Sequence, residues 1–220
     1  MSTPDECNKE GFSQSACGFV LEFEGVIAAY HMNPTVINEE TNCEQASNLG
    51  GWPASLMYNF LNGEDDTIYS AYAANNLEIS SVRSIYMSLP EDLKNVIIDT
   101  YVVSGHGELD NKNLISTDKL YLLNGKEVYG TLLSEEKYLQ KDTANDFTRQ
   151  LDYYFETILT PSEDKFDAKY YNNTGENYGW WLRSASSSDS FFSSSSIGGL
   201  RDAWADSFAY QGVSPAFRIG

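Results

Sequence analysis

The last 43 residues, Tyr178 to Gly220, constrain this chain most, because two apolar ends enclose a middle of unusual composition. The front end, Trp180 to Ser184, reads WWLRS and is typical of a buried core segment. The back end, Val213 to Ile219, alternates apolar and polar residues as a half-buried strand does. Nine of the thirteen residues from Ser184 to Ser196 are serine. Serine runs are typical of flexible linkers, but a linker does not explain a buried strand at the end of the chain.

The serine-rich middle also contains aromatic residues and lacks asparagine. Its aromatics stand among Ser, Gly and Ala with no helical period: Phe191, Phe192, Trp204, Phe208 and Tyr210. Residues 1–177 contain 17 asparagines, whereas residues 178–220 contain none. Large rigid aromatics mixed with small polar residues are the composition of antibody binding loops. The segment therefore favours partner recognition, with the alternative that half of these aromatics fill the core.

The length and charge of the chain exclude some function classes. A chain of 220 residues suits one sizeable domain. Its net charge of −18 disfavours nucleic acid and anionic membrane surfaces, because both are bound mainly through Lys and Arg. No apolar stretch approaches the roughly 18 residues of a membrane span, and the polar, acidic N-terminus lacks the features of a signal peptide. We therefore expect no membrane insertion, and either an intracellular protein or one that reaches a virion or cell surface by another route.

The cysteines and histidines form no recognisable catalytic or zinc motif. Cys7, Cys17 and Cys43 include no CxxC pair; Cys7 and Cys17 can pair if the protein is exported, and free thiols are the alternative. His31 and His106 accompany no GxSxG elbow and are expected to have surface or packing roles. Cys43 lacks a recognisable partner as a nucleophile, and no phosphate-binding glycine motif occurs. The sequence predicts a protein that is not an enzyme.

Apolar patterns predict the elements of one α+β domain. Residues 1–17 are expected to be a loose, flexible arm before a single domain at 18–220. Strands are predicted at Phe19–Phe23, Val26–Tyr30 and Leu120–Leu123, the last followed by a turn at Asn124-Gly125. Helices are predicted after Trp52, with an apolar stripe at Leu56, Met57, Phe60 and Leu61; from Leu89, with Leu93, Val96 and Ile97 inward; and over Thr143–Glu156, with Phe147, Leu151, Tyr154 and Phe155 on one face.

Eight segments, in order, resemble a bacterial and phage domain family of the DUF6273 type. They are MNP (32–34), GGWPAS (50–55), LPEDLKNVIIDT (89–100), VVSGHG (102–107), STDKLYLL (116–123), TRQLDYY (148–154), YGWWLRS (178–184) and GVSPAFRI (212–219). The resemblance runs from about Phe19 to the C-terminus and implies a C-type-lectin-like α+β fold. Such a fold has small mixed or antiparallel sheets and two to three helices. Its first and last strands are adjacent, which here places Phe19–Phe23 beside Pro215–Ile219.

The chain also resembles the variable target proteins of diversity-generating retroelements, which carry a hypervariable patch at the C-terminus of such a scaffold. There, changes at template adenines turn asparagine codons into codons for Ser, Asp, Tyr, Phe and Ala, among others, which fits the missing asparagines. Trp204 departs from this pattern, since no adenine change makes Trp from an asparagine codon. The resemblance implies a noncatalytic recognition protein for a protein or glycan ligand on a cell surface. The alternatives are a fixed-site carbohydrate-binding surface lectin or adhesin and, third, an enzyme.

The predicted binding surface lies in the variable-looking segment 185–211. Side chains alternate along a strand, but Gly198-Gly199 and Gly212 can each host a bulge and leave the register open. We therefore predict a set of ten residues that face the ligand: Ser187, Asp189, Phe191, Ser194, Leu200, Asp202, Trp204, Asp206, Phe208 and Tyr210. Four residues are predicted to be scaffold: Trp180, Trp181, Arg183 and Phe217. Formylglycine-generating enzymes have the fold that the resemblance implies, but they use paired cysteines late in the chain. No cysteine follows Cys43 here, which argues against that activity.

Calcium is the one cofactor that the resemblance leaves open. Sugar-binding C-type lectins hold Ca²⁺ with carboxylates and amides in a late loop, and Asp202 and Asp206 lie in that region. The EPN-type and WND-type ligand signatures of those lectins are absent. We therefore expect no metal and no other cofactor, with Ca²⁺ as the alternative.

Overall fold

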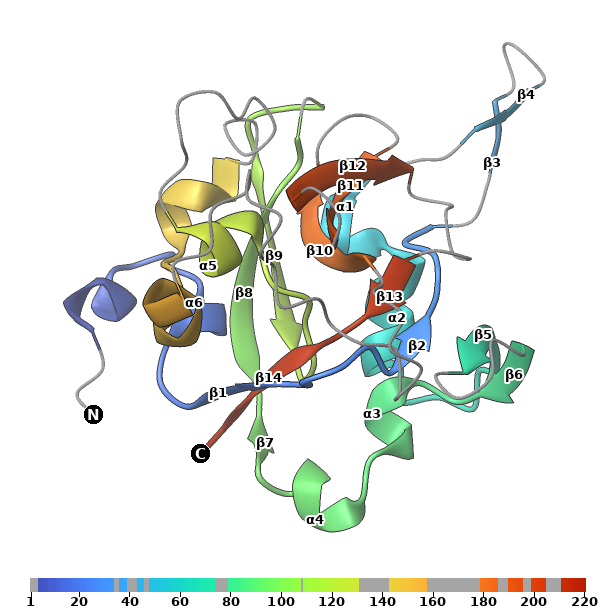
Figure 1. Cartoon of the computed structure of the whole chain (residues 1–220), viewed down its shortest axis with the longest axis horizontal. Coiled ribbons are helices and arrows are strands. Elements are labelled where there is room, and N and C mark those ends of the chain that lie inside the picture. The colour runs from blue at the N-terminus through green and yellow to red at the C-terminus, as the bar shows by residue number, and fades with distance from the viewer. Residues whose placement is uncertain are drawn as a thin grey trace.

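The computed structural model describes residues 4–33, 36–38, 43–45, 48–73, 79–107, 109–130, 143–157, 179–185, 190–195, 199–204 and 211–220. The chain forms a mixed α+β domain in which small, mostly antiparallel sheets and short helices surround a common core (Figure 1).

The largest sheet has seven strands in the order β12-β11-β10-β13-β2-β5-β6. They are β2 (Ala28–Ala29), β5 (Tyr69–Ala73), β6 (Ile79–Val82), β10 (Gly179–Ala185), β11 (Ser190–Ser195), β12 (Gly199–Trp204) and β13 (Gln211–Val213). Among the described strands, β10 and β13 are the only two that pair in parallel. The C-terminal part of the chain thus builds one half of this sheet, and earlier strands build the other.

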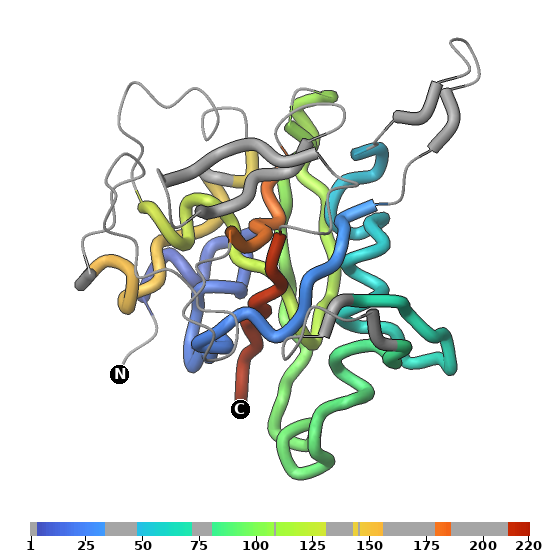
Figure 2. The backbone as a smooth tube through the Cα atoms, turned by 45° about the vertical axis from the view of Figure 1, so that its right-hand side comes forward, coloured from blue at the N-terminus to red at the C-terminus, as the bar shows by residue number. Residues whose placement is uncertain are grey.

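A three-stranded sheet brings the two ends of the domain together. Its order is β1-β14-β7, from β1 (Val20–Glu22), β14 (Ala216–Ile219) and β7 (Ile97–Ile98). Leu21 pairs with Phe217 in an antiparallel register, and the first and last strands lie side by side, as Figure 2 shows. This confirms the predicted neighbourhood of the two strands. The remaining described strands form two separate antiparallel pairs: β3 (Val36–Asn38) with β4 (Cys43–Gln45), and β8 (Thr100–Gly105) with β9 (Asn113–Asp118).

The helices are short. In the described part of the chain, the α-helices are α1 (Gly51–Ala54), α2 (Leu56–Asn62), α3 (Ile85–Ser88), α4 (Glu91–Lys94), α5 (Gly125–Tyr129) and α6 (Asp152–Thr157). The described 3₁₀ helices are η1 (Asp5–Asn8), η2 (Gln14–Ala16) and η4 (Thr143–Phe147). The Ser55 hydroxyl caps α2 by accepting from the Tyr58 amide at 3.0 Å. Met57, Phe60 and Leu61 are fully buried, as the predicted stripe requires.

The helix predicted from Leu89 is only one turn long. Chain beyond α4 enters β7, where Ile98 pairs with Arg218 of β14. The helical pattern of inward-facing residues therefore does not continue past α4. The prediction that Val96 points inward is wrong, because Val96 is 42% exposed, whereas Ile97 is buried.

The helix predicted over Thr143–Glu156 is interrupted between η4 and α6. The interruption bonds to α5 instead: the Leu151 amide donates to the Glu127 carbonyl at 2.9 Å, and Gln150 Nε2 donates to the Val128 carbonyl at 2.9 Å. Phe147 and Phe155 are consequently exposed, at 38% and 71%, rather than sharing a buried face with Tyr154.

Asn124-Gly125 begins a helix rather than a hairpin turn. The Asn124 side chain accepts from the Lys126 amide at 2.7 Å, and Glu127 Oε2 accepts from the Asn124 amide at 2.8 Å, which closes a capping box on α5. The preceding segment, 120–123, is buried as predicted, but its only strand pairing among the described residues is a single bridge from Tyr121 to Ala216.

Candidate ligand-binding surface

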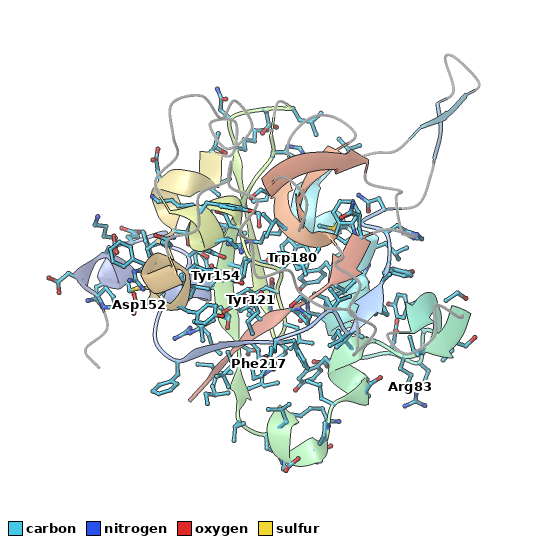
Figure 3. The ribbon with its side chains drawn as sticks, viewed as in Figure 1. Arg83, Tyr121, Asp152, Tyr154, Trp180 and Phe217 are labelled. Carbon is cyan, nitrogen blue, oxygen red and sulfur yellow. A yellow bond between two sulfur atoms is a disulfide. The ribbon has the colours of Figure 1, made fainter. Side chains whose placement is uncertain are left out.

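Strand β10 pairs with β11, the first strand of the candidate surface, and β10 is buried on both faces. Every residue from Trp180 to Ala185 is buried, and because side chains alternate along a strand, this covers both sides. Trp181 Nε1 donates to the Tyr30 carbonyl at 2.7 Å, and the Arg183 amide donates to the Leu123 carbonyl at 2.9 Å. Figure 3 places Trp180 near the centre of the molecule, with Tyr121 and Phe217.

Arg183 forms a buried, bidentate ion pair with Glu127. Both side chains are fully buried; Nη1 donates to Oε2 at 2.6 Å, and Nη2 donates to Oε1 at 2.6 Å. Nη1 also donates to the Leu122 carbonyl at 2.7 Å, and Nη2 to the Val103 carbonyl at 3.3 Å. Burial by itself would raise the pKa of Glu127, but the Arg183 charge and hydrogen bonds bring it below its ordinary value. The pair fixes β10 against α5 and β8.

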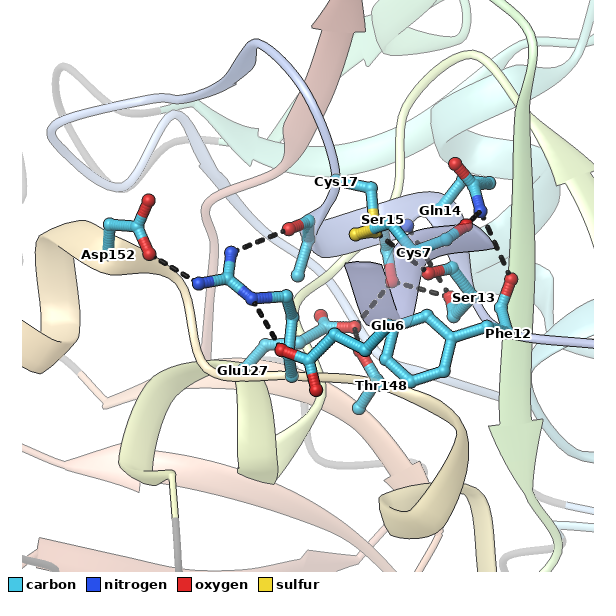
Figure 4. Close-up of a disulfide and its surroundings, with 12 residues drawn as sticks. Glu6, Cys7, Phe12, Ser13, Gln14, Ser15, Cys17, Glu127, Thr148 and Asp152 are labelled. Atoms are coloured by element: carbon cyan, nitrogen blue, oxygen red, sulfur yellow. Dashed lines mark hydrogen bonds and ion pairs between the residues drawn. A yellow bond between two sulfur atoms is a disulfide. The ribbon is translucent and has the colours of Figure 1, made fainter. Parts of the chain in front are cut away.

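The N-terminal clip, residues 4–18, supplies further partners to this ion pair. Cys7 and Cys17 form a disulfide (Figure 4), and the nearby Ser13 and Ser15 are fully buried. The Ser15 hydroxyl donates to Glu127 Oε1 and accepts from Arg183 Nη2 at 3.1 Å.

The clip also bonds to the surrounding elements, so its described residues are not the loose arm that the sequence predicts. The Ser13 hydroxyl accepts from the Val103 amide at 3.1 Å, and the Ser15 carbonyl accepts from the Tyr121 hydroxyl at 2.8 Å. The expectation fails because these partners lie about 90 or more residues further along the chain, where no local pattern reveals them.

Strands β11 and β12 form an antiparallel hairpin at the edge of the seven-stranded sheet. Its register is Ser190↔Trp204, Phe191↔Ala203, Phe192↔Asp202, Ser193↔Arg201, Ser194↔Leu200 and Ser195↔Gly199. Residues paired across such a ladder belong to the same face of the sheet, and the faces alternate along each strand. Four predicted surface residues therefore fall on one face, here called the front face: Ser194, Leu200, Asp202 and Trp204. Phe191 falls on the opposite face.

The hairpin joins β10 through an irregular register. Trp180 pairs with Ser194 and Trp181 with Ser193, but the register shifts before Ala185 pairs with Phe191. Such irregularities bend a strand and change the direction in which its residues point. The other predicted surface residues lie outside the described residues: Ser187, Asp189, Asp206, Phe208 and Tyr210.

The four predicted scaffold residues are all buried. Trp180, Trp181 and Arg183 lie in β10, and Phe217 lies in β14, with its ring centroid 5.9 Å from that of Phe23. Sequence reasoning missed two partners of Arg183, namely Glu127 and Ser15. Glu127 carries a recognisable signal, because Asn124-x-x-Glu127 is the capping-box spacing, whereas nothing local singles out Ser15.

The two histidines have packing and hydrogen-bonding roles in this fold. His106 Nε2 accepts from the Gly50 amide at 3.1 Å, and its Nδ1 lies 3.3 Å from Asp110 Oδ2. The His31 ring stacks on Tyr30, with centroids 4.4 Å apart. Within the described part of the chain, no three His, Cys, Asp or Glu side chains are grouped to hold a metal ion.

Comparison with known families decides which family this arrangement belongs to. Residues 27–220 match the family model of DUF6273, a domain of unknown function. The chain belongs to the DUF6273 family. The matched region runs from just before β2 to the end of β14, so the clip and β1 of this DUF6273 protein lie N-terminal to it. No curated protein and no solved structure matches the chain. Among the described helices of this DUF6273 protein, none is long and apolar enough to cross a membrane.

Proposed function

We propose that this DUF6273 protein is a noncatalytic recognition protein. Its terminal hairpin displays a variable binding surface on a C-type-lectin-like scaffold, as targets of diversity-generating retroelements do. The observation that carries the proposal is the position of the serine- and aromatic-rich segment. Its strands β11 and β12 are the last two strands at one edge of the seven-stranded sheet, while the strand that leads into them, β10, is buried from Trp180 to Ala185. Because fewer strands surround an edge hairpin than surround β10, we expect substitutions in the hairpin to disturb the core less.

The composition of the front face favours a protein ligand. Leu200 and Trp204 share this face with Ser194 and Asp202. Apolar and aromatic anchors among small polar residues are typical of the centres of protein interfaces. The net charge of −18 favours a ligand surface that is neutral or basic, since like charges oppose association.

The register allows a matched test of the display surface. One library varies the front face at Ser194, Leu200, Asp202 and Trp204; the control library varies the opposite face at Phe191, Ser193, Arg201 and Ala203. Both are displayed, scored for folding by resistance to protease, and sorted against a panel of unrelated purified proteins. We expect the front-face library to fold and to yield binders more often than the control library. A front-face library that mostly fails to fold would overturn the proposal.

Two further observations separate the proposal from its alternatives. A near-identical, asparagine-rich copy of the DNA for residues 180–220, beside a reverse-transcriptase gene, is expected if the hairpin is diversified. A glycan array tests the lectin alternative. Binding of the unaltered protein to one class of glycan, kept when the front face is varied, would favour a fixed sugar site elsewhere.

A further inference from the structure

The N-terminal clip depends on its disulfide for much of its own cohesion. Cys7, Phe12 and Cys17 form a small apolar cluster separate from the main core. The regular structure within the clip is limited to the single turns η1 and η2. The Ser13 amide donates to the Phe147 carbonyl at 2.7 Å, and Arg149 Nη1 donates to the Ala16 carbonyl at 3.1 Å. Polar contacts thus dock a loop whose shape the disulfide maintains.

The docked loop is coupled to β10 through the buried ion pair. The Ser15 hydroxyl contacts both charged groups, and a charged group buried without its hydrogen-bond partners is strongly destabilised. Withdrawal of Ser15 removes one partner from Arg183 and one from Glu127 together. Glu127 also holds α5 through its capping box, so the effect reaches both β10 and the start of α5.

We propose that the Cys7–Cys17 disulfide is a redox-sensitive lock on β10, the strand that leads into the terminal hairpin. A dithiol reductant supplies two electrons: the Sγ–Sγ bond breaks, each cysteine sulfur takes up a proton, and the dithiol closes into its own cyclic disulfide. The opened loop gains conformational freedom, so the conformation in which Ser13 and Ser15 are docked becomes less favourable in free energy. The ion pair then loses its serine partner, Ser15, and β10 and α5 loosen.

The burial of the sulfurs sets how the lock opens. Cys17 is fully buried and Cys7 is 6% exposed. Because thiol–disulfide exchange requires direct attack on a sulfur, a reductant reaches the bond only when the clip opens transiently. The lock is therefore resistant in the folded state. It also closes only where thiols are oxidised, which is the condition of exported proteins.

Hydrogen exchange of the full chain tests the lock without any ligand, so this inference and the proposed function can fail separately. The experiment compares oxidised and dithiol-reduced protein and the Cys7→Ser, Cys17→Ser double variant, all carrying Cys43→Ser to remove the third thiol. We expect exchange in β10 and α5 to rise by roughly tenfold or more on reduction, the factor expected for loss of a hydrogen bond to a charged group. Strand β7 serves as the internal reference and is expected to stay protected. Faster exchange confined to residues 4–18, or an equal rise throughout the chain, would overturn the lock.

Ser15→Ala tests the coupling with the disulfide intact. It is expected to speed exchange in β10 and α5 without reduction, because it removes the hydroxyl that contacts both charges. Ser81→Ala, which removes an exposed hydroxyl in β6, is the matched control and is expected to change nothing. If Ser15→Ala leaves β10 as protected as the parent protein, the ion pair does not transmit the state of the clip.

Discussion

The terminal block contains two kinds of strand that differ in how much of the fold surrounds them. β10 lies between β11 and β13, and β14 lies between β1 and β7. By contrast, β12 pairs with β11 on one side, and no other described strand lies on its second side. Strand β10 also carries the packed tryptophans and the paired arginine, while four of the six residues of β11 are serine. Tolerance to substitution should therefore change sharply between β10 and the hairpin.

The largest expected effect lies at Trp181 in β10. Trp181→Ala leaves a cavity at a fully buried site and removes the indole that donates to the Tyr30 carbonyl, so we expect a loss of about 3–5 kcal/mol in the free energy of unfolding. Urea melts measure this. A loss below about 1 kcal/mol would show that β10 tolerates change as an exposed strand does, and the contrast with the hairpin would break down.

The buried ion pair provides the second test. Arg183→Met removes the charge and leaves Glu127 buried without its partner, for which we expect a loss of about 3–5 kcal/mol. Arg83→Met is the matched control, because Arg83 pairs with Asp66 at 3.1 Å and both side chains are exposed. Exposed pairs contribute roughly 0–1 kcal/mol. Similar urea midpoints for the two variants would contradict the role assigned to Arg183.

Trp181 and Arg183 show which features of the fold can be predicted from the sequence and which cannot. The burial of Trp181 follows from an apolar pattern that is visible locally, and the pairing of β1 with β14 agrees with what the family resemblance implies. The partners of Arg183 do not follow from such a pattern, since Glu127 is 56 residues away and Ser15 is 168 residues away. A buried charge predicts that some partner exists, but only the fold selects which one. The same limit explains the predicted helix over 143–156, which is interrupted by bonds to α5 that no helical period reveals.

The candidate surface shows a related limit. An alternating pattern predicts that every second residue shares a face, but the phase of alternation depends on the turn and on irregularities of register. Phe191 was grouped with Ser194 from sequence, and the ladder puts the two on opposite faces. From the sequence, the glycines at positions 198 and 199 can host a bulge, so the register of the segment is undetermined.

The third test concerns Asp118, a buried carboxyl group that forms no ion pair among the described residues. Asp118 in β9 is fully buried, and its Oδ2 accepts a hydrogen bond from Trp52 Nε1 at 2.9 Å. This donor is neutral, whereas the donor to the buried carboxylate of Glu127 is the charged Arg183. Burial raises the pKa of Asp118 to about 6. The folded state thus holds this proton more tightly than the unfolded state. Its contribution to stability is complete below about pH 4 and is lost as the pH rises through about 6.

Asp118→Asn removes this titration while keeping an oxygen for Trp52. The free energy of unfolding of the variant, minus that of the parent, should rise by roughly 2–3 kcal/mol from about pH 4 to about pH 7.5. Urea melts at both pH values measure the difference, in which the other titrating groups largely cancel. A difference that does not change with pH would mean that Asp118 titrates alike in the folded and unfolded states.

The smallest expected effect lies in the hairpin, where a pair of serines makes the comparison between regions direct. Ser184 in β10 is fully buried, and its hydroxyl accepts from the Gly125 amide at 3.0 Å, at the start of α5. Ser184→Ala leaves that amide without this acceptor, and we expect a loss of about 1–3 kcal/mol. Ser194→Ala, ten residues later in the edge hairpin, should stay within about 0.5 kcal/mol, as surface substitutions usually do. Because both variants replace serine by alanine, any difference between their losses in the free energy of unfolding comes from the position in the fold. If Ser194→Ala costs as much as Ser184→Ala in urea melts, the front face of the hairpin belongs to the core, and a surface that varies there is not compatible with this fold.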